Sequence, residues 1–305
     1  NSPAEELRRL GFAGEITLFD SDQAAPYDRP NLSKDYLAGT APDDWLPLHP
    51  RSHYKELAMD LVLGRRVIEL DAAAKRVTLD DGTSRRFGAV VIATGADPVR
   101  LSIPGADGPP IHHLRSLADS QRIIAATSEA RRAVVLGAGF IGLEVAASLR
   151  ARGLDVHVVA PGTRPLERVL GAALGDFIKG LHEAHGVVFH LGQTALGVEG
   201  RHVVLQNGER LDADLVVAGV GVPPGVSLAE AAGLMVDHGI IVDRYLETPP
   251  KGIFAIGDVA RWPDPRSGAR VRVEHWVLAQ RHGQAVAKVI VGYDEGVRLL
   301  LLALV

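Results

Sequence analysis

The chain has 305 residues, of which 47% are hydrophobic and 23% charged, and its formal net charge is −4. These totals are typical of an α/β protein of about two domains, and the lack of a basic excess gives no reason to expect a nucleic-acid partner. The sequence contains no cysteine, which excludes disulfides, thiolate metal sites, a redox-active cysteine pair and a cysteine nucleophile.

The first third of the chain alternates strand and turn signals. Apolar runs at 15–19, 66–71, 76–80 and 89–93 have strand character, and the second and third form a hairpin across a short loop. Residues 97–110 are dense in proline and glycine, which predicts a linker or a crossover between domains.

The same order of elements then repeats. A helix at 118–130, a strand at 133–137, a helix ending at Gly153 and a strand at 155–160 have the spacing of a βαβ unit. A helix at 174–186, a strand, a hairpin at 198–211 and an apolar strand ending in glycine at 221 follow. The repeat predicts an α/β fold with two Rossmann-like nucleotide-binding domains, each with an antiparallel hairpin insertion.

The later sequence is expected to return to the first domain. A strand at 253–256 ends in glycine and an acid, and a long helix follows at 275–292. We therefore assign 1–110 and 238–292 to one domain, 111–237 to the second, and 293–305 to a remnant of a C-terminal region.

Gly137, Gly139 and Gly142 form the motif GAGFIG between a strand and a helix. The first glycine permits a tight turn, the second lets the backbone approach a pyrophosphate, and the third lets the helix pack on the strand. Its context favours a nucleotide site over a tight turn without a ligand.

The end of the next strand leaves the nucleotide preference open. An acid there would bind the ribose 2′-hydroxyl of NAD, but the chain has Ala160. Arg164 either meets the 2′-phosphate of NADPH or is a solvated loop charge, with a slight lean to accepting NADPH.

Five motifs in one order carry a family resemblance: PYDRPNLSK (26–34), VIATGA (91–96), GAGFIGLE (137–144), IFAIGDVA (253–260) and EHWVLAQ (274–280). Over residues 8–292 they resemble FAD-dependent pyridine-nucleotide oxidoreductases of the ferredoxin-reductase and apoptosis-inducing-factor-like type, including Rieske-associated bacterial members. The resemblance implies FAD at a first glycine turn and NAD(P)H at the turn beginning at Gly137. We expect the first turn to precede Asn1 in the full polypeptide.

The resemblance also implies roles for individual residues. Lys34 would lie near the reactive edge of the flavin, and Glu144 would lie by the nicotinamide and pair with Lys34. Both are assigned as catalytic residues. The alternative is that Lys34 is an ordinary loop lysine and Glu144 an ordinary glutamate on a helix surface. The residues expected at the two cofactor sites are Asp20, Arg29, Pro30, Lys34, Thr94, Gly95, Ala96, Gly137, Gly139, Phe140, Ile141, Gly142, Glu144, Arg164, Gly221, Gly257, Asp258, Glu274, His275 and Trp276.

Several alternatives stay open. Asp22 is as plausible as Asp20 for the FAD ribose, and Asp258 is either a ligand of the flavin's ribityl chain, a helix N-cap, or both. Trp276 is a flavin contact or a core residue. His182 and His185 are spaced i, i+3 on a helix without a further ligand, so we expect a surface pair and no metal site.

Because the chain has no cysteine, it cannot reduce disulfides or peroxides through thiols. The chemistry that is left is hydride transfer from NAD(P)H to FAD. We expect a flavoprotein reductase that feeds an iron–sulfur protein of the ferredoxin or Rieske type. The alternative is a redox-sensing NAD(P)H-binding flavoprotein with little turnover. A cytoplasmic location and no membrane span are expected, because LLLLALV is far shorter than the roughly 20 residues a span needs. The oligomeric state and the electron acceptor stay open.

Overall fold

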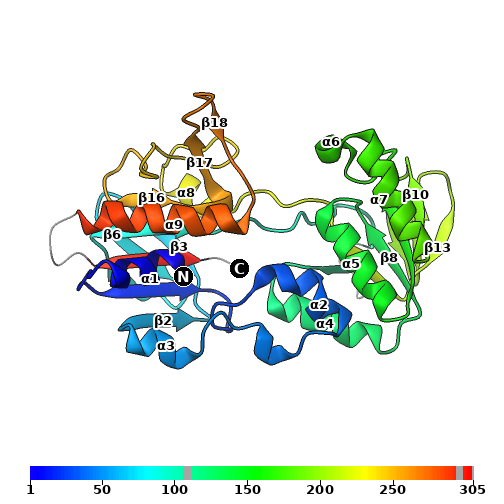
Figure 1. The fold of residues 1–305 in the computed structure, drawn as a ribbon, viewed down its shortest axis with the longest axis horizontal. Helices are drawn as coiled ribbons and strands as arrows, with labels where there is room; N and C mark the ends of the chain where they lie inside the picture. Colours follow the sequence, from blue (N-terminus) through cyan, green and yellow to red (C-terminus); the bar gives the residue numbers. More distant parts are fainter. Residues whose placement is uncertain (106–110, 293–297, 304–305) are drawn as a thin grey trace. The chain divides into compact units, whose positions relative to one another are not determined.

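The structure is a computed structural model that describes residues 1–105, 111–292 and 298–303. Its contacts divide the chain into two compact units (Figure 1). The first unit contains residues 1–27, 47–97 and 223–305, and the second contains residues 28–46 and 98–222.

A five-stranded parallel sheet forms the centre of the first unit. Its strands carry apolar residues on both faces, as expected of a parallel sheet covered on both sides. The strand order is β16 (Ile253–Ala255), β6 (Ala89–Ala93), β19 (Leu299–Ala303), β1 (Ile16–Asp20) and β2 (Met59–Leu63).

The middle strand of this sheet, β19, comes from the segment for which the sequence predicted only a C-terminal remnant. It pairs in parallel with β1, where Ile16 faces Leu299, and with β6, where Ala89 faces Leu299. Leu299 and Leu300 have no exposed surface. An unbroken run of leucines suits a strand buried on both faces, which is why this segment joins the sheet instead of standing apart.

Helices and small antiparallel sheets surround the central sheet of the first unit. Helix α1 packs against α9 (red-orange in Figure 1), where a side chain at Gly283 would overlap Pro3. The other elements are α1 (Ser2–Arg9), α3 (Arg51–Glu56), β3 (Val67–Asp71), β4 (Arg76–Leu79), β5 (Ser84–Arg86), α8 (Ser227–Ala231), β15 (Ile240–Ile241), η3 (Gly257–Val259), β17 (Ala260–Pro263), β18 (Arg270–Val271) and α9 (Trp276–Val291).

The second unit has its own five-stranded parallel sheet, in which β8 lies between β9 and β14 and the direction of chain progression reverses. The order is β10 (Val187–Leu191), β9 (Asp155–Ala160), β8 (Arg132–Leu136), β14 (Leu215–Ala218) and β7 (Ile111–His113). An antiparallel sheet is made by β11 (Ala195–Glu199), β12 (His202–Leu205) and β13 (Arg210–Asp212). The predicted α/β class with hairpin insertions is therefore present in both units.

Seven helical segments belong to the second unit among the described residues: η1 (Arg29–Ser33), α2 (Asp35–Ala38), η2 (Asp43–Trp45), α4 (Leu117–Thr127), α5 (Phe140–Ala151), α6 (Glu167–Leu170) and α7 (Ala172–Ala184). The first three lie in residues 28–46, which the sequence analysis grouped with the first domain. Side-chain hydroxyls explain the difference: Ser120 Oγ donates to Leu32 O at 2.9 Å, and Ser148 Oγ donates to Ser33 O at 2.7 Å. Residues 223–237, grouped with the second domain, lie in the first unit.

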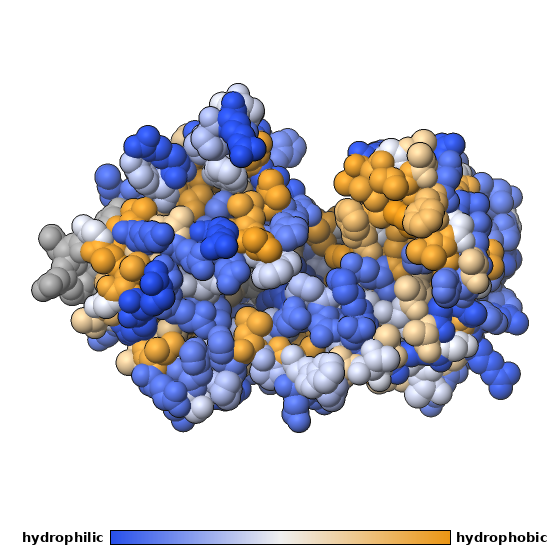
Figure 2. All heavy atoms as spheres, in the orientation of Figure 1, coloured by the Kyte–Doolittle hydropathy of each residue, from blue (hydrophilic) through white to orange (hydrophobic). Residues whose placement is uncertain are grey.

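Helix α7 has an unusual surface. An amphipathic helix normally buries its apolar stripe, but the exposed fractions of Leu174, Phe177 and Leu181 are 51%, 67% and 49%. Apolar atoms gather over α6 and α7 in Figure 2, where Val169 is also exposed. The periodicity of this segment therefore predicted the helix correctly but not the face that it buries.

Candidate functional site

The glycine turn after β8 is built by two glycines that cannot carry a side chain. The backbone φ of Gly137 is +110°, and a Cβ there would lie 2.3 Å from Gly219 O. A Cβ at Gly142 would lie 2.1 Å from Gly137 O. The close packing of β8, α5 and the loop after β14 therefore requires both residues to be glycine.

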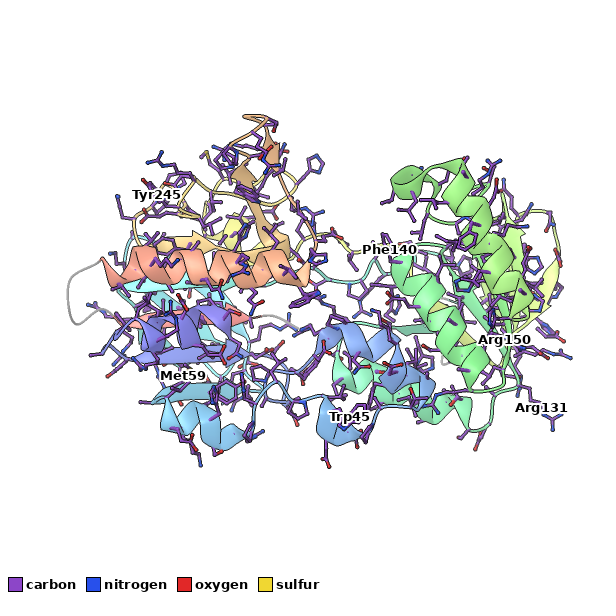
Figure 3. The ribbon with its side chains drawn as sticks, viewed as in Figure 1. Trp45, Met59, Arg131, Phe140, Arg150 and Tyr245 are labelled. Atoms are coloured by element: carbon purple, nitrogen blue, oxygen red, sulfur yellow. The ribbon has the colours of Figure 1, made fainter. Side chains whose placement is uncertain are left out.

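Gly139 differs from its two neighbours in the motif, because a Cβ at this position would meet no atom within 4 Å. It is the N-cap of α5, and no side chain caps the helix. The N–H groups of the first turn are thus left for a ligand, as a pyrophosphate site requires. The next two side chains, Phe140 and Ile141, are 54% and 37% exposed, and Figure 3 labels Phe140 at the start of α5.

The loop after β9 gives Arg164 two acidic partners. Its Nε lies 2.8 Å from Asp176 Oδ1 and its Nη1 lies 3.1 Å from Glu167 Oε1. These contacts raise the pKa of the guanidinium, chiefly through the hydrogen bond to Asp176. Arg164 is therefore paired with two carboxylates, and the choice between contact with a 2′-phosphate and a solvated loop charge stays a prediction. Ala160, at the end of β9, is buried.

Lys34 and Glu144 form the ion pair that the sequence analysis expected. Lys34 Nζ lies 3.0 Å from Glu144 Oε1, and the two side chains are 48% and 30% exposed. Ser33 Oγ donates to the other carboxylate oxygen, Glu144 Oε2, at 2.6 Å. Glu144 is thus held at both oxygens by consecutive residues of the segment 28–46.

Ser33 and Ser148 are functional candidates that sequence reasoning missed. Ser148 lies on α5, one turn after Glu144, and its Oγ reaches the carbonyls of Ser33 and Lys34 at 2.7 and 3.2 Å. Only Ser33 had a signal in the sequence, its place inside the motif RPNLSK.

The remaining expected residues of this unit lie in loops and short turns. Arg29 and Pro30 begin η1, and Pro30 O accepts a hydrogen bond from Lys34 Nζ at 3.1 Å. Gly221 follows β14 with a φ of +126°, and its carbonyl accepts from Val99 N at 2.9 Å. The first hydrogen bond connects Lys34 to the start of η1, and the second connects the loop after β14 to Val99.

In the first unit, the candidate residues follow the carboxyl ends of parallel strands. Asp20 ends β1, Thr94 follows β6, and Gly257 and Asp258 follow β16. Carboxyl ends of parallel strands meet at one edge of a sheet, where α/β proteins bind their ligands. The donor set and the edge therefore fit a dinucleotide such as FAD.

Thr94, Gly95 and Ala96 form a fixed backbone turn. Thr94 is fully buried, and its Oγ1 donates to Gly225 O at 2.6 Å, which leaves backbone atoms for a ligand. Gly95 has a φ of +65°, and Ala96 forms a bridge with Pro224.

Asp20 is the last residue of β1 and Asp22 follows it, and which of the two acids would meet the FAD ribose stays open. Both carboxylate oxygens of Asp22 are used locally, by Ala24 N at 3.0 Å and by the Tyr27 hydroxyl at 2.7 Å. Asp20 Oδ1 accepts from Asp22 N at 3.0 Å.

His282 is a second residue that the sequence analysis missed. It lies on the buried face of α9, and its Nδ1 accepts a hydrogen bond from Gly257 N at 3.3 Å. Burial lowers the pKa of His282 to about 4, so the ring is neutral at neutral pH. Gly257 has a φ of +68°, and a Cβ there would lie 3.2 Å from Ala279 Cβ. The turn before Asp258 is therefore fixed from α9.

Two open alternatives near this turn are resolved by placement. Asp258 lies inside η3, whose N-cap is Ile256, so the N-cap reading is wrong. Trp276 is 63% exposed, so it is not a core residue.

The start of α9 is organised by its own polar residues. His275 is the N-cap of the helix, and its side chain accepts from Val277 N at 3.2 Å. Glu274 pairs with Arg272 at 2.7 Å, and Arg272 also donates to Asp258 O at 3.1 Å. The EHW segment and the turn after β16 are therefore connected through Arg272.

The predicted surface pair His182 and His185 lies at the end of α7. His185 Nδ1 contacts Leu181 O at 2.8 Å, and His182 packs edge-on against Phe189. Neither belongs to the group of possible metal ligands found among the described residues.

Comparison with known proteins agrees with this geometry. The model of the pyridine nucleotide-disulphide oxidoreductase family matches residues 2–283. The chain belongs to this family. The sequence contains no cysteine, so it has no thiol pair of the kind that disulphide reduction requires.

Two relatives illustrate the similarity. The chain is 38% identical over 294 residues to rhodocoxin reductase of Rhodococcus erythropolis, covering 95% of this chain and 69% of the relative. It is 37% identical over 302 residues to the ferredoxin–NAD(+) reductase subunit of the benzene 1,2-dioxygenase system of Pseudomonas putida, covering 95% and 72%.

Solved structures show the same fold. The ferredoxin reductase for the CYP199A2 system of Rhodopseudomonas palustris superimposes with a TM-score of 0.91 at 36% identity, covering 97% of this chain and 74% of that one. Putidaredoxin reductase in its covalent complex with putidaredoxin gives a TM-score of 0.92 at 32% identity, covering 96% and 73%.

These findings confirm the predicted family, the fold class and the class of enzyme, an FAD-dependent NAD(P)H oxidoreductase of the ferredoxin-reductase type. Within residues 1–105, 111–292 and 298–303, no helix is both long and apolar enough to cross a membrane. The roles of individual site residues and the boundaries of the cofactor domains remain predictions.

Proposed function

We propose that this chain is a reductase component that takes electrons from NADH through FAD to a small iron–sulfur protein. The observation that carries the proposal is the Lys34–Glu144 ion pair of 3.0 Å. It joins a residue of the flavin-side motif RPNLSK to the last residue of the nucleotide motif GAGFIGLE. Hydride transfer needs both rings ordered together, and a shared ion pair orders both motifs.

The second unit would hold the nicotinamide nucleotide. Its pyrophosphate would meet the uncapped N-terminus of α5 over Gly139, where the helix dipole favours negative charge. Glu144 begins the second turn of this helix, and Ser33 and Lys34 fix its carboxylate. The nicotinamide would therefore be positioned against an oriented acid.

The first unit would hold FAD along the edge made by Asp20, Gly95 and Asp258. Bound FAD accepts two electrons from NADH together and passes them on singly, which an iron–sulfur acceptor requires. Within the first unit, the N-terminus of α9 at His275 would offer the favourable end of a helix dipole to the flavin. This dipole would favour electron density on the ring.

We propose NADH over NADPH as the donor. Arg164, a candidate partner of a 2′-phosphate, is already paired with Glu167 at the start of α6 and with Asp176 on α7. Those carboxylates disfavour a further phosphate. We also propose a cytoplasmic location, where NADH is regenerated; fractionation of the native host followed by immunodetection tests it.

The acceptor class is supported by relatives, which are named as ferredoxin and rubredoxin reductases, and by the covalent putidaredoxin complex of a structural neighbour. The experiment is anaerobic titration of the flavin-loaded protein with NADH and with NADPH, followed by addition of a ferredoxin or of rubredoxin. We expect the flavin bands to bleach at lower NADH than NADPH, and the acceptor to be reduced over many turnovers.

A different result would identify the other candidate. Bleaching that gives a long-lived reduced complex, negligible acceptor reduction and a changed elution volume would favour a redox sensor. A Lys34→Met, Glu144→Gln double variant tests the role of the pair directly, since it removes both charges while keeping side-chain lengths similar. Unchanged reduction rates in that variant would refute the role given to the pair.

A further inference from the structure

A cluster of two histidines and a glutamate lies in the first unit, outside the cofactor regions described above. Glu5 Oε1 is 2.8 Å from His49 Nε2 and 3.4 Å from His53 Nε2. All three ligand atoms lie within 4.8 Å of one another, and this is the one such group found in the described part of the chain. Nothing in the nucleotide chemistry uses these residues.

The separations suit a metal ion. Zinc binds imidazole nitrogen and carboxylate oxygen at about 2.0–2.2 Å, so two ligand atoms of a tetrahedral site lie roughly 3.3 Å apart. The two observed separations from Glu5 Oε1, 2.8 and 3.4 Å, lie on either side of this value. The spacing of the ligand atoms therefore suits the ion, and rotation of one imidazole would direct both nitrogens at it.

His53 provides a second observation. Its Nε2 atom is shielded from solvent and makes no hydrogen bond within the described residues, although Glu5 lies nearby. A shielded nitrogen without a hydrogen bond is costly unless something else satisfies it. The His49 and His53 rings stack with centroids 4.1 Å apart at an interplanar angle of 23°, so one ring must turn before both nitrogens can bind one ion in the plane of their rings.

The surrounding fold holds the three ligands in place. Arg8, one turn after Glu5 on α1, donates from Nε to Leu57 O at 2.7 Å and from Nη2 to Ala58 O at 2.9 Å. These bonds tie α1 to the end of α3. Tyr54 is 1% exposed and packs edge-on against both imidazoles, so it forms a buried wall of the cluster.

We propose that Glu5, His49 and His53 bind one divalent ion of the zinc class per chain. Two imidazoles and one carboxylate match Zn²⁺ and Co²⁺ better than Mg²⁺ or Ca²⁺, which prefer oxygen ligands alone. Three protein ligands leave a fourth position for water. The ion links α1 to α3 and to the segment before α3, and so stabilises this part of the first unit.

The experiment is a titration of the chelator-treated, flavin-loaded protein with Co²⁺, followed by displacement with Zn²⁺. Four-coordinate Co²⁺ absorbs visible light much more strongly than six-coordinate Co²⁺, so the spectrum reports the geometry. We expect one ion per chain, intense visible bands, and a rise in the unfolding midpoint of more than about 2 °C at saturating Zn²⁺.

Three variants and one control make the assignment specific. Glu5→Gln, His49→Ala and His53→Ala are each expected to weaken Co²⁺ binding at least about tenfold, because loss of an outer partner alone costs that much. The control is the His182→Ala, His185→Ala double variant, which removes a histidine pair from α7 and leaves the cluster intact. All these side chains are at least partly exposed, so circular dichroism should show native folds.

Three results would overturn the proposal. They are the absence of saturable binding, a spectrum of six-coordinate cobalt, and an equal loss of binding in the His182, His185 control. None of them bears on electron transfer, because the cofactor residues are unchanged.

Discussion

The two parallel sheets obtain their middle strands from opposite directions along the chain. In the second unit, β8 is followed at once by the glycine turn, by α5 and by β9. In the first unit, β19 lies between β6 and β1 in the position that β8 has between β14 and β9, yet it follows α9 in sequence. A sheet thus requires an apolar strand of the right direction, and does not require that the strand come first.

The comparison separates folding from ligand binding. Both middle strands are buried, with no exposed surface at Leu300 and at Val135. The strand β8 is followed by a glycine turn and by a helix without a side-chain cap. In the first unit, the described candidate residues follow β1, β6 and β16.

The largest effect is expected from a charged residue in β19, the middle strand of the first sheet. Leu300→Asp should lower the free energy of unfolding of the first unit by at least about 3–5 kcal/mol, because it buries an unpaired charge. Hydrogen exchange with peptide resolution would measure this in each unit separately. Ile68→Asp is the control, since Ile68 is 55% exposed in the same unit. Equal protection of β1 and β6 in the variant and the parent would show that β19 is not part of the stable sheet.

The next effect concerns acid stability of the first unit. The folded pKa of His282 is lowered to about 4, so the unfolded state binds its proton first as the pH falls. The contribution is complete above pH about 6.5 and is lost between pH about 6.5 and 4, by roughly 3 kcal/mol. Protonation would also place an N–H donor against Gly257 N–H.

Urea unfolding at pH 7, 5.5 and 4.5 checks this expectation. The difference in stability between the parent and His282→Gln should shrink as the pH falls. A difference that stays constant across this range would contradict the role given to His282. Acidic groups titrate in both proteins, so the comparison cancels their contribution.

The two glycines of the second unit separate folding from binding directly. Gly137→Ala should destabilise this unit by about 2 kcal/mol or more, because its φ is +110° and its Cβ would overlap Gly219 O. Gly139→Ala should leave the unfolding midpoint almost unchanged, since its Cβ meets nothing within 4 Å, but weaken NADH binding at least about tenfold. Calorimetric NADH titration and thermal unfolding measure both; the opposite ranking of the two variants would refute this division.

The smallest effect is expected at Ser33. Ser33→Ala removes the 2.6 Å hydrogen bond to Glu144 Oε2 while leaving Lys34 in place. The hydrogen bond contributes about 1 kcal/mol to holding the Glu144 carboxylate in position. Its loss should slow flavin reduction by NADH roughly fivefold in stopped-flow measurements. Ser128→Ala is the control, because Ser128 Oγ bonds only to Ala125 O of its own helix among the described contacts. Slowing of both variants to the same extent would exclude a specific role for Ser33.

Local sequence predicted much of this protein. Glycine at 137, 139 and 142, placed between an apolar strand and a helix, predicted the turn and its helix because only local sterics and the helix N-terminus are involved. The hairpins were also predictable, since alternating residues and short loops determine them. The order of five motifs predicted the family, and the absence of cysteine narrowed its chemistry.

Other features depend on contacts between residues far apart in the chain, and these could not be predicted from the sequence. The hydroxyl of Ser33 and the imidazole of His282 find their partners 111 and 25 residues away, at Glu144 and Gly257. Periodicity shows that such residues lie on a helix or a turn, but not which group faces them. The same holds for Glu5 and His49, which meet only because α1 and α3 are joined by Arg8.

By itself, the sequence determined the two nucleotide-binding sheets, the glycine turn after β8 and the class of chemistry, because short-range sterics and apolar patterning specify them. Tertiary structure alone decided that LLLLA becomes the middle strand of the first sheet and that residues 28–46 join the second unit. An apolar run such as LLLLA does not specify its neighbours, so its position depends on which strand edges are available for pairing. The position of residues 28–46 depends on the hydroxyls of Ser120 and Ser148, which bind carbonyls of this segment.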